Sequence, residues 1–159
     1  MTDNSLSQEP SLFGSTDQRT ALRAQAEGYV LRASLMMRRA RILVTQDRVD
    51  ACALLTDRRT ALGQHFQRYQ RLKHGSIFDP IVAHAPTSSK IVARGMKIDC
   101  MELGQEFVAY QTRWLRVPPS EWQWYKADML ATVDKLSLHL DAELRAIRQL
   151  LTVAEFYRR

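Results

Sequence analysis

Apolar residues recur at alternating steps of three and four along most of this chain, and this spacing restricts the fold more than any other feature. An α-helix repeats every 3.6 residues, so the spacing gathers the apolar side chains on one helical face. It predicts four helices over residues 16–45, 48–73, 88–115 and 121–155. Short connections make consecutive helices antiparallel neighbours. The sequence therefore predicts an all-α fold, an antiparallel up-down-up-down four-helix bundle.

One core is predicted to take residues from all four helices. Glycine (6) and proline (5) are scarce, which favours helices over a turn-rich sheet fold. The apolar fraction of 45% is large enough for a sizeable core in a chain of 159 residues. The predicted core residues are Tyr29, Met36, Leu55, Leu62, Phe66, Met96, Leu103, Tyr110, Leu136 and Ile147.

The predicted helix ends depend on capping residues. In a capping box, the first side chain accepts from the backbone three residues later, and the side chain there bonds back. A left-handed glycine commonly ends a helix. The predicted boxes are Ser15 with Gln18 and Ser120 with Gln123, the predicted N-cap of the third helix is Thr87, and the predicted stop of the second is Gly75.

The first residues differ in composition from the rest of the chain. They are polar and lack the apolar run of a signal peptide, so we expect a disordered tail over 1–14 and one bundle domain over 15–159. No run of about 18 apolar residues predicts a membrane span. The two cysteines, Cys52 and Cys100, lack metal-type spacing. Without an export signal, they are expected to be reduced, buried thiols of a cytoplasmic protein.

The net charge of +6 is spread over the predicted helices, with one denser cluster at Arg38, Arg39 and Arg41. Such a cluster permits weak attraction to nucleic acid. It also suits the C-terminal end of a helix, where positive charge complements the helix dipole. No aromatic residues interleave with these arginines and no helix-turn-helix spacing is present. We therefore favour a solvated basic helix end over a nucleic-acid partner.

Several polar residues fall on predicted core positions, whereas glycine-rich phosphate loops, zinc motifs and nucleophile elbows are absent from the sequence. Asp99 takes a core position on the third helix. His139 and Glu143 lie one turn apart on the fourth helix, and Lys73 follows Tyr69 by one turn on the second. A carboxylate in a helical core is costly unless it is paired or bound to metal. These residues are therefore the candidate site.

A set of residues on and before the third and fourth predicted helices carries a family resemblance: Phe107, Tyr110, Trp114, Trp122, the stretch 125–136 and the Phe78-Asp79-Pro80 step. In these residues the chain resembles the bacterial hemerythrin-like proteins, the family of HHE cation-binding domains. The resemblance covers roughly residues 50–151. It implies an antiparallel four-helix bundle that holds two non-heme irons through histidines and bridging carboxylates, with roles in oxygen binding, iron handling, or oxygen or nitric oxide sensing.

The ligands that the resemblance implies are largely missing. Tyr69 and Lys73 stand where the family has a histidine followed by a glutamate, and the third helix offers Asp99 but no histidine. Only His139 and Glu143 match a histidine-then-glutamate pair. With four histidines in the whole chain, the five-histidine site of the oxygen carriers cannot form.

Two interpretations follow from this ligand loss. The first is a non-enzymatic scaffold without a cofactor, a regulatory or stress-related module that binds a protein partner. Lys73 then pairs with Asp99 or Glu143, and Tyr69 or His139 completes the hydrogen bonds. The second is a residual metal binder, in which a mixed nitrogen and oxygen set holds iron, manganese or zinc. Its ligands are His74, Asp99, His139 and Glu143. We favour the first, because a protonated lysine cannot bind metal and repels a cation.

Overall fold

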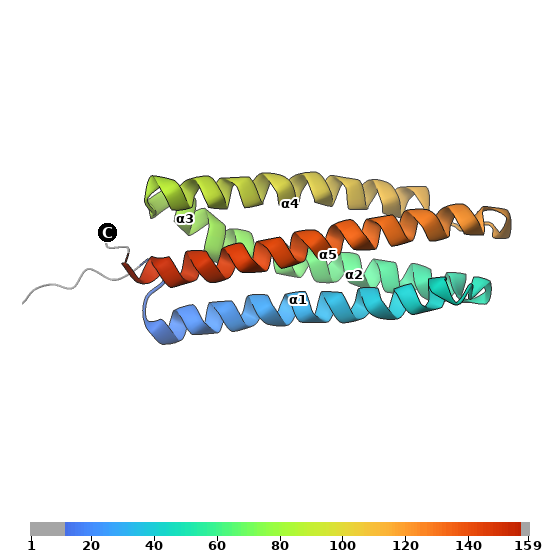
Figure 1. Ribbon diagram of the computed structural model, residues 1–159, viewed down its shortest axis with the longest axis horizontal. Helices are drawn as coiled ribbons and strands as arrows, with labels where there is room; N and C mark the ends of the chain where they lie inside the picture. The colour runs from blue at the N-terminus through green and yellow to red at the C-terminus, as the bar shows by residue number, and fades with distance from the viewer. Residues whose placement is uncertain (1–11, 157–159) are drawn as a thin grey trace, which may run out of the picture.

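A computed structural model describes residues 12–156, and every regular element in this range is helical (Figure 1). The four long helices are α1 (Thr16–Thr45), α2 (Cys52–Lys73), α4 (Thr87–Arg113) and α5 (Trp122–Val153). Their bounds agree with the predicted ones to within a few residues, which confirms the all-α fold. A membrane span would need a longer apolar stretch than any of the described helices provides.

Five short elements complete the described chain. In Figure 1, the connections between α1 and α2 and between α4 and α5 lie at one end of the molecule, and α3 lies at the other. The short elements are η1 (Val49–Ala51), η2 (His74–Phe78), α3 (Asp79–His84), η3 (Pro119–Glu121) and η4 (Ala154–Phe156).

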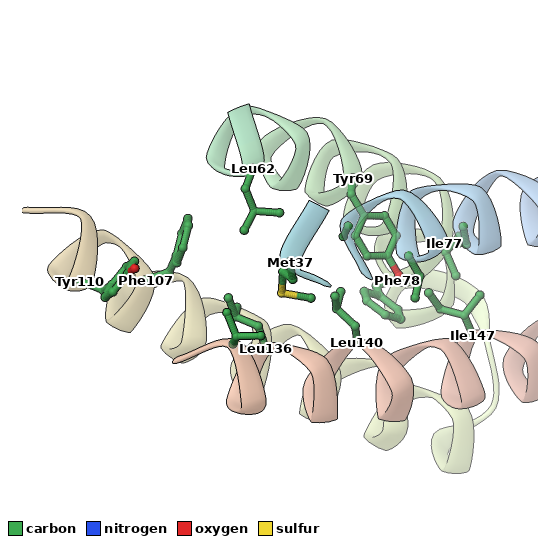
Figure 2. Close-up of a cluster of buried hydrophobic side chains, with 14 of the residues drawn as sticks. Met37, Leu62, Tyr69, Ile77, Phe78, Phe107, Tyr110, Leu136, Leu140 and Ile147 are labelled. Atoms are coloured by element: carbon green, nitrogen blue, oxygen red, sulfur yellow. The ribbon is translucent and has the colours of Figure 1, made fainter. Parts of the chain in front are cut away.

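The predicted core is confirmed. All ten predicted residues belong to a single hydrophobic cluster, five of them buried and five partly buried. Figure 2 shows part of this cluster, with Met37, Tyr69, Phe78, Phe107 and Leu136 contributed by different elements. Burying each large apolar side chain contributes about 1.5–3 kcal/mol, so this shared core is the main source of the stability of the bundle.

One edge of the bundle is more open than the others. Helix α1 packs along α2 and α5, and α4 packs along α5, but close backbone contacts between α2 and α4 are sparse. Side chains bridge this edge where Phe66 meets Phe107 edge-on, with ring centroids 5.6 Å apart. A Cβ atom on Gly63 would lie 2.8 Å from the side chain of Gln111, so the glycine permits the close approach there. A groove runs along this edge, and these bridging residues are part of its lining.

The helix ends follow the predictions only in part. The first capping box is confirmed: Ser15 Oγ accepts from the backbone N–H of Gln18 at 3.2 Å, and Gln18 Oε1 accepts from the backbone N–H of Ser15 at 2.7 Å. The second box is wrong, because η3 precedes α5 and no side chain caps that helix. The N-cap of α4 is Pro86, one residue before the predicted one, and it forms no side-chain cap.

Gly75 does not end the second helix, which is a further correction. The backbone continues through η2 as a single π-helical turn, in which the backbone N–H of Asp79 donates to the carbonyl of His74. Pro80 lies in the first turn of α3, directly after the π turn, and donates no backbone hydrogen bond. The chain therefore needs no left-handed residue here. Such π turns often occur at functional sites, and this one carries His74.

The boundary of the predicted tail also needs correction. Leu12 and Phe13 are buried in the core, so the chain packs against the bundle before the capping box. Gly14 then turns the chain with a φ of 73°, a conformation that suits glycine. The remainder of the predicted tail, 1–11, lies outside the described residues.

Candidate functional site

A buried ion pair between α2 and α5 is the centre of the candidate site. The Nζ atom of Lys73 lies 2.8 Å from Oε1 and 3.0 Å from Oε2 of Glu143. The two side chains are 5% and 0% exposed. At these distances the ammonium donates to both carboxylate oxygens, so each charge is compensated by its partner. This is one of the two pairings predicted for Lys73.

Tyr69 flanks the ion pair with its ring, but its hydroxyl has no hydrogen-bond partner among the described residues, so the hydrogen bond predicted for it is not formed. The ammonium of Lys73 lies 4.4 Å from the centroid of the Tyr69 ring, a cation–π arrangement. On its other side, the Tyr69 ring stacks on Tyr29 of α1 at 5.5 Å. Burial, followed by the nearby charge of Glu143, raises the pKa of Tyr69. Tyr69 therefore stays neutral, and its ring packs against the ammonium of Lys73.

His139 supplies a second positive group to Glu143. Its Nε2 atom lies 3.2 Å from Oε2 of Glu143, one helical turn further along α5. Burial alone would lower the pKa of His139, but its contacts with Cys100 and Glu143 raise it to about 9. Burial likewise opposes ionisation of Glu143, yet His139 and Lys73 together hold the pKa of its carboxyl below the usual value. Both α5 residues are therefore charged at neutral pH.

Cys100 belongs to the same cluster, and the sequence interpretation missed it. Its Sγ atom, a ring nitrogen of His139 and a carboxylate oxygen of Glu143 all lie within 4.8 Å of one another. Burial would raise the pKa of this thiol, but polar contacts with His139 and His74, and the charge of Lys73, lower it to about 6. Cys100 is therefore largely a thiolate at neutral pH, beside positively charged groups.

Asp99 is not part of the buried cluster, and its predicted position is wrong. The residue is exposed, whereas its neighbour Cys100 is half-buried and lines the groove. The spacing of apolar residues in the sequence does place this cysteine on the buried face of the helix. Steps of four and three run through Met96, Cys100, Leu103, Phe107, Tyr110 and Trp114. Cys100 continues this stripe, and a shift of one residue turns a helical side chain by about 100° toward solvent.

The donor set does not fit the metal centre that the resemblance implies. The ligands predicted for a residual metal site included Asp99, which faces solvent instead. Glu143 has both oxygens bonded to the ammonium of Lys73, so a cation would have to displace that group and bear its repulsion. His139 and Cys100 do lie close to Glu143, but the local charge already balances without metal. Hydrogen bonding and ion pairing account for the arrangement.

The groove between α2 and α4 opens onto this cluster. It has a volume of about 660 Å³, and α5 forms its floor with Leu136, His139 and Leu140. Its walls combine apolar side chains with the amides of Gln64, Gln67 and Gln70 from α2. Lys73 and Cys100 also line it. An apolar cleft of this size with a few polar groups is typical of a site for a small organic ligand.

The other predicted polar residues lie apart from the cluster. His65 is buried, and its Nε2–H donates to the carbonyl of Tyr29 at 2.8 Å, so it is a hydrogen-bonded core histidine. Of the basic cluster, Arg38 and Arg39 are exposed, and Arg41 pairs with Asp134 of α5. These contacts suit a solvated helix face, the interpretation favoured from the sequence.

No family model, curated protein or solved structure matches this chain. The proposed function is therefore based on the geometry of the described residues. The residues that matter are Lys73, Glu143, His139 and Cys100, together with the groove onto which three of them open.

Proposed function

We propose that this protein is a non-enzymatic regulatory module, a hemerythrin-like antiparallel up-down-up-down bundle in which a lysine replaces the metal. In this proposal, the groove between α2 and α4 binds a small organic ligand, and the bound state is passed on to a protein partner. The observation that carries the proposal is the Lys73–Glu143 ion pair at the inner side of an open groove.

The charges support a binding role more than a catalytic one. Lys73 is held on two sides, by Glu143 and by the ring of Tyr69, so its ammonium group has structural contacts on both sides. Stabilisation of a developing negative charge in a reaction requires donors aimed at an open position. The two oxygens of Glu143 already occupy two of the three N–H donors of Lys73, which leaves the groove with a fixed charge pattern and an apolar floor.

The openness of one edge supports a ligand-dependent change in the bundle. A ligand in the groove would contact α2, α4 and α5 together, because residues of all three helices line it. Where close contacts between α2 and α4 are sparse, such a ligand would stabilise one spacing of the helices over others. A partner that recognises this edge would then register occupancy of the groove.

The proposal is tested with the fluorescent probe 8-anilinonaphthalene-1-sulfonate. We expect saturable binding to the folded protein, and Gly104→Phe should weaken it about tenfold or more, because a ring in a preformed pocket takes the place of a ligand. Gly104 lines the groove and has open space at its Cβ position. Fluorescence titration measures the affinity, and circular dichroism verifies the fold.

Gly28→Phe is the matched control. Gly28 also lies inside a long helix with open space at its Cβ position, but on α1, outside the groove. This variant should bind the probe as the original chain does. Equal binding by both variants, or no saturable binding at all, would overturn the proposed ligand site. Stoichiometric iron or zinc in protein purified without chelator would overturn the metal-free part of the proposal.

A further inference from the structure

The thiol of Cys100 has a role that a passive ion-pair core does not explain. Its side chain lines the groove on α4 and meets the imidazole of His139, which in turn contacts Glu143. His74, on the π turn, approaches the same thiol, and its buried Nε2 atom has no hydrogen-bond partner among the described residues. A nucleophile, a charged imidazole and an open cavity thus meet at one point.

We propose that Cys100 is a covalent attachment site for α,β-unsaturated carbonyl compounds that enter the groove. This inference rests on the proposed function and deepens it, because it names the chemical class of ligand to which the module responds. The product is one stable adduct per chain rather than a turnover cycle.

The chemistry is a conjugate addition that needs no oxidant or reductant. The sulfur of Cys100 attacks the β-carbon of the compound, and a carbon–sulfur bond forms. The π electrons of the carbon–carbon double bond move toward the carbonyl and give an enolate. The imidazolium of His139 then donates its proton to the α-carbon, which leaves a thioether and a neutral imidazole. Solvent returns a proton to His139.

The groups that face the sulfur favour its anionic form. Lys73 and Tyr69 approach the cluster from α2, His74 from η2, and His139 and Glu143 from α5. The charges of Lys73 and His139 outnumber the single charge of Glu143. Contacts with His139 and His74 hold the pKa of Cys100 at about 6 despite burial, so the thiolate is present at and below neutral pH.

The groove selects an organic electrophile over a small oxidant. Its volume of about 660 Å³ and its floor of Leu136 and Leu140 suit a molecule with an apolar body. A peroxide would need only access to the sulfur and would gain nothing from such a cavity. Glutamine amides on α2 offer donors for the carbonyl of the compound.

The second cysteine provides a comparison within the same chain. Cys52 is half-buried like Cys100, but it lies at the start of α2 and does not line the groove. Its thiol donates to the carbonyl of Val49 at 3.0 Å. Both cysteines therefore experience the same protein concentration, fold and reagent, and differ in their surroundings.

The test is the rate of labelling by N-ethylmaleimide, followed by mass spectrometry of peptides from the folded protein. At pH 6, Cys100 should react about tenfold faster than an unstructured cysteine peptide, because its larger thiolate fraction outweighs the lower nucleophilicity of a low-pKa sulfur. Cys52 should lag behind Cys100. The rate at Cys100 should rise with a midpoint near pH 6, the pKa of its thiol.

His139→Gln should move that midpoint to higher pH, whereas His84→Gln, at an exposed histidine of α3, should leave it in place. Equal rates at the two cysteines, or labelling of Cys100 only after unfolding in urea, would overturn the inference. That comparison uses the unaltered chain, so it stands even where a variant fails to fold. Saturable dye binding with unselective labelling would overturn this inference alone, and selective labelling without dye binding would overturn the proposed ligand module alone.

Discussion

Lys73→Met should lower the free energy of unfolding by about 3–5 kcal/mol at neutral pH, the usual cost of removing one partner of a buried ion pair. The variant leaves Glu143 buried at 0% exposure with only His139 to compensate it. Methionine matches the length of the lysine stem, so little packing is lost. Urea unfolding followed by circular dichroism measures the change.

Lys135→Met is the matched control for this prediction. Lys135 pairs with Glu106 across α4 and α5 at 2.7 Å, but the side chains are 64% and 56% exposed. An exposed pair of this kind contributes about 0–1 kcal/mol, so the control should be nearly neutral. Equal effects of the two substitutions would show that Lys73 is an ordinary surface lysine. Added manganese or zinc should leave both unfolding curves unchanged, and stabilisation by metal would contradict the ion-pair interpretation.

The pH dependence of this variant follows from the direction of the Glu143 shift. The pKa of Glu143 is lowered in the folded protein, so its contribution to stability is present above the unfolded value of 4.5. That contribution is lost as the pH falls through the lower folded value. In Lys73→Met much of the contribution is already gone, so the deficit relative to the original chain should shrink at acid pH. A deficit that grows on acidification would contradict this account.

Phe78→Ala should lower the free energy of unfolding by a similar amount, about 3–5 kcal/mol, because truncating a buried phenylalanine leaves a cavity. Phe78 is 0% exposed and ends the π turn that carries His74. The rings of Phe78 and His74 meet edge-on, with their centroids 5.8 Å apart. The substitution therefore removes core packing and a support of the His74 ring together.

Phe156→Ala is the matched control, since that phenylalanine is 76% exposed in η4. A surface substitution of this kind changes stability by about 0.5 kcal/mol or less. Urea midpoints of the two variants compare them directly. A loss below about 1 kcal/mol for Phe78→Ala would show that the π turn closes over the space, against the rigid packing of a bundle core.

An ion pair of Lys73 with a core carboxylate could be predicted from the sequence because two patterns converged, but the partner stayed open between Asp99 and Glu143. Lys73 follows Tyr69 at a helical step, and Glu143 lies on the apolar stripe of its own helix. Two opposite charges on core positions have to meet or bind other ions, since burial of either alone is costly. The packing of the helices decided which carboxylate forms the pair, because it buries Glu143 beside Lys73 and leaves Asp99 exposed.

Helix existence, helix length and the shared core were determined by the sequence, because the 3.6-residue period is a local property that recurs in every long helix. The tertiary structure decided the rotation of each helix about its axis. Asp99 and Cys100 are adjacent in sequence and point in different directions from the helix axis. Asp99 is exposed, whereas Cys100 joins the cluster. The spacing of the apolar stripe favours Cys100 over Asp99, but only the contacts with His139 and His74 on other elements show that the thiol belongs to the cluster.

The π turn and the open edge were likewise decided by packing. Gly75 is a common helix stop in isolation, yet the burial of Ile77 and Phe78 favours a continuous backbone there. The groove exists because α4 packs on α5 and leaves space beside α2. Spacing between helices depends on side chains that are far apart in sequence. The period of one helix therefore cannot specify it, and the site that opens there emerges only in three dimensions.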